Sequence, residues 1–277
     1  MLQAEGPFEK HIEAMRYSLF AGGKRVRPIL CLAAGSAIDD SRQTSANLLP
    51  VGCALECIHT YSLIHDDLPA MDNDELRRGK PTNHVLYGEA GAILAGDGLL
   101  TFAFQLLSDD STATLDPARR LRIMSLIATA AGSLGMVGGQ ALDIATENTE
   151  FPFETLKTIH RSKTGALITC SVQAGAVAAG ANSEQFARLT EYGDNIGLAF
   201  QIVDDLLNAT ATTEQLGKAA GSDAERGKAT YPGYFGIEET HRLARQAVDR
   251  AIESLSDFDA KAEPLRALAQ YIYARSN

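Results

Sequence analysis

The sequence lacks the features of membrane-spanning and exported proteins. None of its apolar runs approaches the ~20 residues needed to cross a bilayer. The first seven residues, Met-Leu-Gln-Ala-Glu-Gly-Pro, contain neither a basic segment nor an apolar core, so we expect no signal peptide. Paired metal-binding spacings are missing among the cysteines, which stand in apolar stretches. We expect buried, reduced thiols and a cytoplasmic location; the four cysteines are Cys31, Cys53, Cys57 and Cys170.

An excess of positive charge is lacking as well. Lys and Arg number 25 against 35 Asp and Glu, which gives a net charge of −10. This balance excludes nucleic acid as a bulk electrostatic partner. Any anion that the protein binds is therefore held by a local cluster of basic side chains.

Strand signals are nearly absent, whereas apolar residues recur at helical spacing along the whole chain. Gly22 and Gly23 end a first helix, and Pro28 is expected at the N1 position of the next one. Further helices are predicted over residues 44–68, 90–107, 117–137, 152–180, 183–208, 238–255 and 262–275. We predict one all-α domain over residues 1–277, packed around a deep cavity or a long core. Few residues precede Gly22, so the first helix is expected to be short or incomplete.

A dense group of charged residues follows the apolar helical stretch that ends at Ile64. Its members are Asp66, Asp67, Asp72, Arg77 and Arg78. Carboxylates bind hard divalent cations, and arginines bind phosphate oxygens through forked hydrogen bonds. The group indicates a site for a metal–diphosphate complex, the alternative being a solvated acidic turn. A straight helix would not place Asp66 and Asp72 on one face, but Pro69 ends the helix and can return Asp72 toward Asp66.

A second acidic pair lies far along the chain. Asp204 and Asp205 end the apolar segment 200–203, and Asn208 follows Asp204 by one helical turn on the same face. One such pair alone is typical of the polar end of a helix. Two pairs, each at the end of an apolar helix, favour metal sites that face each other across a cavity.

Basic residues recur in short segments that contain glycine. The segment 22–28 places three cations between two helices, where free backbone N–H groups also favour anions. Further lysines stand beside Gly165, Gly217 and Gly227, or close to them; they are Lys163, Lys218 and Lys228. Any one of them alone is typical of a solvated surface. His59 and Tyr61 precede the first acidic group on its helix, and either one alone would be an ordinary structural residue.

These motifs together carry a family resemblance. They are Gly-Gly-Lys-Arg-Val-Arg-Pro (22–28), Asp-Asp-Leu-Pro-Ala-Met-Asp (66–72), Arg-Arg-Gly (77–79), Gly-Gly-Gln-Ala-Leu-Asp (138–143), Lys-Thr-Gly (163–165) and Phe-Gln-Ile-Val-Asp-Asp (200–205). In this order the sequence resembles the short-chain trans-prenyl diphosphate synthases, and within them bacterial farnesyl diphosphate synthase. The resemblance implies an isoprenoid-synthase bundle of antiparallel helices around a deep central cavity, usually as a homodimer.

The resemblance also implies the roles of individual residues. The Mg²⁺ ligands would be Asp66, Asp67, Asp72, Asp204 and Asp205. The residues that bind the allylic diphosphate would be Arg77, Lys163, Lys218 and Lys228. The diphosphate of isopentenyl diphosphate would be bound by Lys24, Arg27, His59 and Arg78. Oxygen dipoles from Thr164 and Gln201 would face the allylic cation, which forms in a cavity poor in water. Growing charge on the leaving diphosphate is stabilised electrostatically, and no protein nucleophile is required.

Two positions bear on the function that the resemblance implies. The family's second motif ordinarily ends in Asp, and here the residue is Asn208, a weaker ligand. Tyr61, with its neighbour Ser62, fits a floor that stops chain growth at fifteen carbons and so predicts farnesyl diphosphate. The segment 72–84 also looks like geranylgeranyl diphosphate synthases, which is the alternative product class.

Two other classes of protein compete with a synthase. A terpene cyclase shares the fold and the first acidic motif, but its second motif should offer Asn, Ser and Glu, and Thr212 stands where Glu belongs. A non-catalytic helical subunit of a partner synthase should have lost acidic ligands, and only Asn208 departs among the six acidic positions. The sequence therefore favours the synthase.

Overall fold

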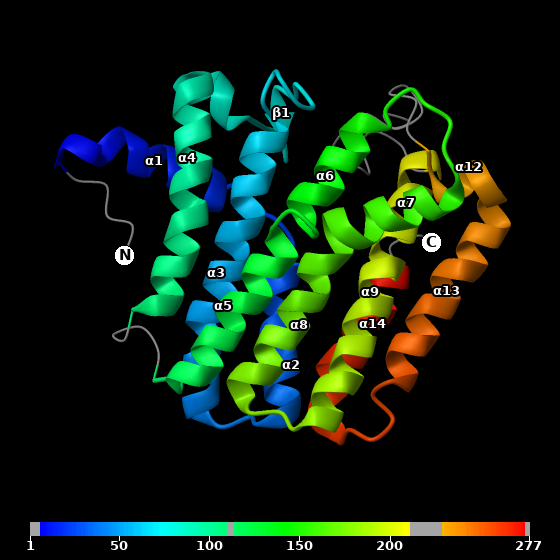
Figure 1. Cartoon of the computed structure of the whole chain (residues 1–277). Coiled ribbons are helices and arrows are strands. Elements are labelled where there is room, and N and C mark those ends of the chain that lie inside the picture. Colours follow the sequence, from blue (N-terminus) through cyan, green and yellow to red (C-terminus); the bar gives the residue numbers. More distant parts are fainter. Residues whose placement is uncertain (1–5, 110–113, 211–228, 275–277) are drawn as a thin grey trace.

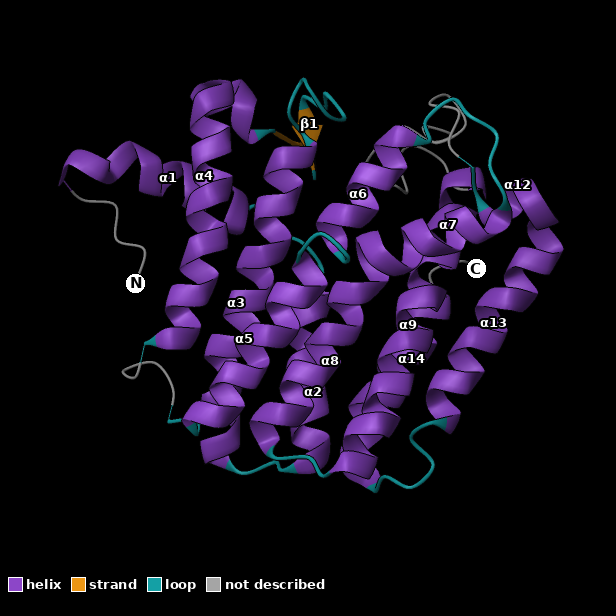
Figure 2. Cartoon of the chain, viewed as in Figure 1, coloured by secondary structure: helices purple, strands orange, loops and turns teal. Residues whose placement is uncertain are grey.

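The computed structural model describes residues 6–109, 114–210 and 229–274, and helices dominate this part of the chain (Figure 1, Figure 2). The α-helices are α1 (Glu9–Leu19), α2 (Val26–Ile38), α3 (Arg42–Asp66), α4 (Asn83–Ser108), α5 (Pro117–Ala131), α6 (Met136–Ala145), α7 (Phe153–Ile159), α8 (Ala166–Ala179), α9 (Ser183–Thr210), α12 (Tyr231–Phe235), α13 (Ile237–Glu253) and α14 (Glu263–Ala274). Shorter elements are η1 (Gly6–Phe8), the π-helix η2 (His160–Gly165), η3 (Ala260–Ala262), and an antiparallel hairpin of β1 (Leu76–Arg77) and β2 (Lys80–Pro81). The predicted all-α class is confirmed.

The long helices run alongside one another and form a bundle (Figure 1). The C-terminal ends of α3 and α9 both lie at the upper end of the bundle in this view, where the β1 hairpin and α6 are also found. The two acidic pairs stand at these helix ends. The fold therefore brings to one end of the molecule two motifs that are far apart in the sequence.

The core consists of large side chains that α3, α4 and α5 bury against one another, and of a second layer around α2, α8 and α9. Leu55 and Ile58 on α3 pack in the first layer with Leu99 and Ile123, and all four are fully buried. In the second layer Tyr192 of α9 is fully buried, and its hydroxyl donates to the Leu265 carbonyl at 2.7 Å. This partner satisfies the hydroxyl, so the bulky ring can be buried without an unpaired polar group.

Local chemistry fixes both ends of α3, the helix that carries the first acidic group. Ser41 caps its start, where the Ser41 hydroxyl accepts the Thr44 backbone N–H at 3.2 Å. The helix ends at Asp66, three residues before Pro69, because the residue before a proline avoids the helical region. Pro50 lies within the helix without ending it.

Several predicted boundaries differ from the observed ones. The stretch predicted as one helix over 117–137 is two helices, because the chain turns between α5 and α6 at residues 132–135. The stretch 152–180 is helical throughout but passes through the π-helix η2 in its middle. Helix α4 begins at Asn83, earlier than predicted, and Pro28 occupies the third position of α2 instead of the first.

Two helical stretches are long and apolar enough to cross a membrane by length and composition, where the sequence analysis expected none. They are Asn83–Ser108 and Pro117–Ala145. The first is non-helical at Gly88, with φ 74° and ψ 164°, and the second contains the turn between α5 and α6. Parts of both (39% and 33% of the apolar windows) are buried inside the bundle. Because core helices of other proteins meet the same criteria, these stretches are weak evidence for a membrane span.

Candidate active site

The loop after α3 returns Asp72 to the end of the helix, as the position of Pro69 predicted. The Asp72 backbone N–H donates to the Asp66 carbonyl at 2.8 Å, and the Asn73 N–H donates to the Leu68 carbonyl at 3.1 Å. Asn73 has a φ of 53°, a value that Asn adopts more readily than most residues. The loop therefore brings two carboxylates of the first acidic group to the same helix end.

Asp67 of this group is bound to Arg77 from the hairpin. The guanidinium donates to both carboxylate oxygens, with Nε–Oδ1 at 2.8 Å, Nε–Oδ2 at 2.9 Å and Nη2–Oδ1 at 2.6 Å. The hairpin presents Arg77 through a turn at Arg78 and Gly79, which both have positive φ values. Asp67 is 3% exposed, and burial raises the pKa of its carboxyl although Arg77 opposes the shift.

Asp66 has both carboxylates and cations close by. Burial is the main cause that raises the pKa of Asp66 to about 6, and the charges of Asp72 and Asp67 add to it. Lys163 and Arg77 oppose the shift, which places both cations within electrostatic reach of Asp66. A cation near Asp66 and Asp72 would relieve their repulsion.

The π-helix η2 carries Lys163 and Thr164 and packs closely on α6. A Cβ at Gly139 would lie 2.3 Å from the Lys163 backbone nitrogen, so only glycine permits this approach. The Lys163 ammonium donates to Asp143 Oδ2 at 2.7 Å. Gln140 Oε1 is buried and has no hydrogen-bond partner among the residues that the structure describes. The sequence analysis assigned no role to Gln140 or Asp143, although the motif Gly-Gly-Gln-Ala-Leu-Asp (138–143) contains both residues and could have indicated them.

Basic side chains gather where α2, α3 and the hairpin meet. Burial lowers the pKa of Arg27 to about 10, while Glu56 and Asp204 oppose the shift. Burial, followed by the charge of Arg27 and then that of Arg78, holds the pKa of His59 well below its usual value. His59 is therefore neutral at pH 7 and can donate a hydrogen bond to an anion without carrying charge.

Glycine also positions Arg78. The Arg78 guanidinium donates to the Gly22 carbonyl, and a Cβ at Gly23 would lie 2.3 Å from Arg78 Nη1. Gly23 has a φ of 117°, which other residues rarely adopt. The exposed Lys24 follows directly, so the predicted group of Lys24, Arg27, His59 and Arg78 is built around this turn.

The second acidic pair divides between two environments. Asp204 is partly buried and acts electrostatically on Arg27. Asp205 is 6% exposed, accepts the Tyr231 backbone N–H at 2.9 Å and lies 3.8 Å from His160 Nε2. Consecutive helical residues point about 100° apart, so the two carboxylates cannot face the same way. The structure thus places Asp205 in the packing of α9 against α12 and η2, and its role as a metal ligand stays a prediction.

The remaining predicted residues of the second site either lie on α9 near Asp204 or fall outside the described residues. Gln201 is partly buried on α9 and Asn208 is 5% exposed, one turn beyond Asp204. Lys218 and Lys228 lie outside the described residues, as does Thr212.

A cavity of ≈ 420 Å³ lies beside Asp66, between α3, α6 and η2. Its polar lining includes Arg27, His59, Asp66, Lys163 and Thr164. Its apolar lining comes from α3, α6 and the loop after α3, and Tyr61 and Ser62 also line it. A separate small cavity of ≈ 30 Å³ is lined by Asp67, Arg77 and Arg78. The arrangement can hold an anionic group at one end and a hydrocarbon chain at the other.

The acidic residues fit a magnesium ion that is shared with a phosphate ligand. Within the described residues no three His, Cys, Asp or Glu side chains come close enough to enclose a metal by themselves. Asp67 is bound to Arg77, and Asp205 accepts the Tyr231 N–H. Asp66 and Asp72 lie together at the C-terminal end of α3, and Asp204 lies on α9. Magnesium is usually bound by one or two carboxylates together with substrate phosphates and water, so this set suits it.

Comparison with known proteins agrees with the geometry. The profile of the polyprenyl synthetase family matches residues 9–270. A geranylgeranyl diphosphate synthase of Cyanophora paradoxa is 48% identical over 266 residues, covering 96% of this chain and 87% of the relative. A farnesyl diphosphate synthase of Geobacillus stearothermophilus is 46% identical over 273 residues, covering 99% and 91%.

The fold matches solved structures as well. The crystal structure of an FPP/GFPP synthase from Zymomonas mobilis has a TM-score of 0.86 and 42% identity, and the match covers 98% of this chain and 91% of that one. The resemblance that the motifs carried is therefore confirmed. The chain belongs to the polyprenyl synthetase family and is a prenyltransferase.

Proposed function

We propose that the protein condenses isopentenyl diphosphate with dimethylallyl and geranyl diphosphates to give farnesyl diphosphate. The observation that carries this proposal is the cavity whose lining combines the cations Arg27 and Lys163 with apolar side chains and Tyr61. The cations suit diphosphates, and the apolar side chains suit a growing isoprenoid chain.

The allylic diphosphate would be bound between the ends of α3 and α9. Asp66, Asp72 and Asp204 are the carboxylates that would hold Mg²⁺, and the ion would neutralise charge on the leaving diphosphate. Lys163 and Arg77, which already lie within electrostatic reach of Asp66, would bind the same phosphate oxygens. Lys218 and Lys228, beyond the described residues, would complete this set.

Isopentenyl diphosphate would be bound by the basic group of Lys24, Arg27, His59 and Arg78. Arg27 is partly buried and His59 is neutral, so the site combines fixed charge with a hydrogen bond from a neutral donor. Fixed donors that need no rearrangement stabilise developing charge most effectively. Thr164 and Gln201 would direct oxygen dipoles at the allylic cation, and the apolar walls would exclude water from it. The proton lost in the condensation would go to the departed diphosphate.

Tyr61 decides the proposed product length. Relatives named as farnesyl and geranylgeranyl synthases match this chain at similar identity, so their names do not separate the two products. Tyr61 is 6% exposed and lines the cavity five residues before Asp66, about 7.5 Å along the helix at the usual rise per residue. A ring at this depth favours the fifteen-carbon product.

Replacement of Tyr61 tests this assignment. Tyr61→Ala should lengthen the main product by at least one five-carbon unit, because removal of the ring extends the cavity. Tyr61→Phe keeps the ring and should keep the wild-type product. Chromatography of the dephosphorylated alcohols separates these outcomes, and an unchanged length in the alanine variant would show that Tyr61 is not the floor.

We also propose a homodimer. Exposed apolar side chains gather on α4, where Val85, Leu86, Ile93 and Leu94 are 43–58% exposed. A second copy of the chain would cover such a surface. Light scattering after size exclusion should give twice the chain mass of 29.6 kDa, and a single chain mass would contradict the proposal.

A further inference from the structure

His65 lies between the proposed chain-length residue Tyr61 and helix α4. It stands one helical turn after Tyr61 on α3, and both side chains line the cavity. Their rings meet edge to face, with centroids 5.8 Å apart and an interplanar angle of 76°. This arrangement is favourable between aromatic rings, so the His65 ring restricts the orientation of Tyr61.

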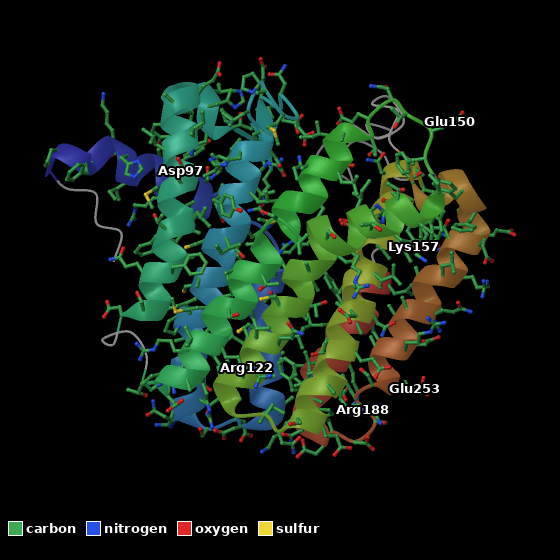
Figure 3. All side chains as sticks on the ribbon, in the orientation of Figure 1. Asp97, Arg122, Glu150, Lys157, Arg188 and Glu253 are labelled. Atoms are coloured by element: carbon green, nitrogen blue, oxygen red, sulfur yellow. The ribbon has the colours of Figure 1, made fainter. Side chains whose placement is uncertain are left out.

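Helix α4 in turn holds His65 from the other side. His65 Nε2 lies 3.1 Å from the Ile93 carbonyl, to which it donates its proton, and 3.8 Å from Asp97 Oδ1. Helices α3 and α4 run side by side in Figure 1, and Figure 3 labels Asp97 on α4. The carbonyl and the carboxylate therefore fix the imidazole to α4 at one ring nitrogen.

Gly96 makes this close contact possible. A Cβ at position 96 would lie 2.2 Å from His65 Nε2 and 2.6 Å from its Cδ2. Such a distance is too short for any side chain at position 96, so an alanine there would push the imidazole away from α4. The position of the His65 ring is thus set by the absence of a side chain on α4.

We propose that His65 is a positioning residue for product length: pinned to α4 at Gly96, it holds the Tyr61 ring across the end of the cavity. The proposal rests on the proposed function, in which Tyr61 stops chain growth. Removal of the imidazole frees Tyr61 to rotate and adds space beside it, so the chain grows longer. A push from α4 moves the imidazole inward and shortens the cavity, so the chain stops earlier.

The test compares three single variants by the chain lengths of their products. His65→Ala should raise the fraction of product longer than the wild-type product at least fivefold. Gly96→Ala should raise the fraction of shorter product at least threefold. Gly98→Ala is the matched control, because its Cβ meets the flexible side chains of Met15 and His11 on α1 and does not reach His65. It should keep the wild-type distribution.

A double variant shows whether His65 acts through Tyr61. If it does, Tyr61→Ala combined with His65→Ala gives the same distribution as Tyr61→Ala alone. A wild-type distribution in His65→Ala, or equal shifts in Gly96→Ala and Gly98→Ala, overturns the proposal. If His65→Ala fails to fold, the comparison of Gly96→Ala with Gly98→Ala still tests the proposal. A wild-type enzyme that makes twenty-carbon product overturns only the proposed length, because every shift is measured relative to wild type.

Discussion

Gly139→Ala tests whether the close packing of α6 on η2 positions Lys163, which we propose binds the allylic diphosphate. The added Cβ would lie 2.3 Å from the Lys163 backbone nitrogen and 2.7 Å from its Cα, whereas ordinary contacts begin at 3.4 Å. The two backbones must therefore separate by about 1 Å. The nearest contacts of this Cβ are all with backbone atoms, so Lys163 moves together with its backbone, away from Gly139.

The displacement predicts both a loss of stability and a loss of rate. Overpacking a well-packed contact costs about 1–3 kcal/mol in the free energy of unfolding. A misplacement of ~1 Å at a reacting group costs on the order of 100-fold in rate. Because Lys163 would act on the leaving diphosphate, we expect the larger effect in kcat, with the KM for isopentenyl diphosphate changed little.

The assay measures condensation kinetics and thermal unfolding of the same preparations. Gly165→Ala is the matched control on η2, since its Cβ meets only the His160 carbonyl, at 3.4 Å, which is ordinary contact. It should keep kcat within about threefold, because an alanine that fits its site is neutral or stabilising. A Gly139→Ala enzyme with wild-type kcat, or a Gly165→Ala enzyme equally impaired, would refute the reasoning.

Three further substitutions probe separate parts of the site. Burial raises the pKa of Asp66 to about 6, so the folded protein must hold a charged, buried carboxylate once the pH exceeds that value. In chelator the free energy of unfolding should therefore fall as the pH rises from about 4 to 6. Asp66→Asn should raise the Tm above pH 6 and leave it unchanged near pH 4. Gly23→Ala, at a φ of 117° and against the Arg78 guanidinium, should raise the KM for isopentenyl diphosphate about tenfold with a smaller change in kcat, measured by steady-state kinetics. Glu56→Gln removes the carboxylate that accepts from Arg25 and should lower the free energy of unfolding in urea by about 1–3 kcal/mol, less than for a fully buried pair because the Arg25 side chain is 30% exposed.

The sequence predicted those parts of the fold that short-range patterns determine. Apolar periodicity placed α3 and α9 to within a few residues, since apolar residues recur at helical spacing along both. Pro69 predicted the return of Asp72, because a proline must end or distort the helix that precedes it. The pairing of the two acidic motifs at one end of the molecule followed only from the family resemblance and from their positions at helix ends.

Other features depend on contacts between distant segments, which one sequence does not reveal. The break between α5 and α6 falls at Gly-Ser-Leu-Gly (132–135), and the apolar residues on both sides of it led periodicity alone to merge the two helices. Asp204 and Asp205 look equivalent in sequence, yet Asp205 accepts the N–H of Tyr231 from a segment 26 residues away. The same limit applies to His65, whose partner Gly96 lies on another helix.

The central claim is that this cavity condenses isopentenyl diphosphate with an allylic diphosphate. The most direct test supplies the purified chain with labelled isopentenyl diphosphate, dimethylallyl diphosphate and Mg²⁺, and separates the dephosphorylated alcohols by length. The account predicts a dominant fifteen-carbon alcohol that a chelator abolishes. A twenty-carbon alcohol would contradict only the proposed role of Tyr61 and would leave the condensation chemistry intact. No product at all would contradict the central claim and favour a non-catalytic subunit.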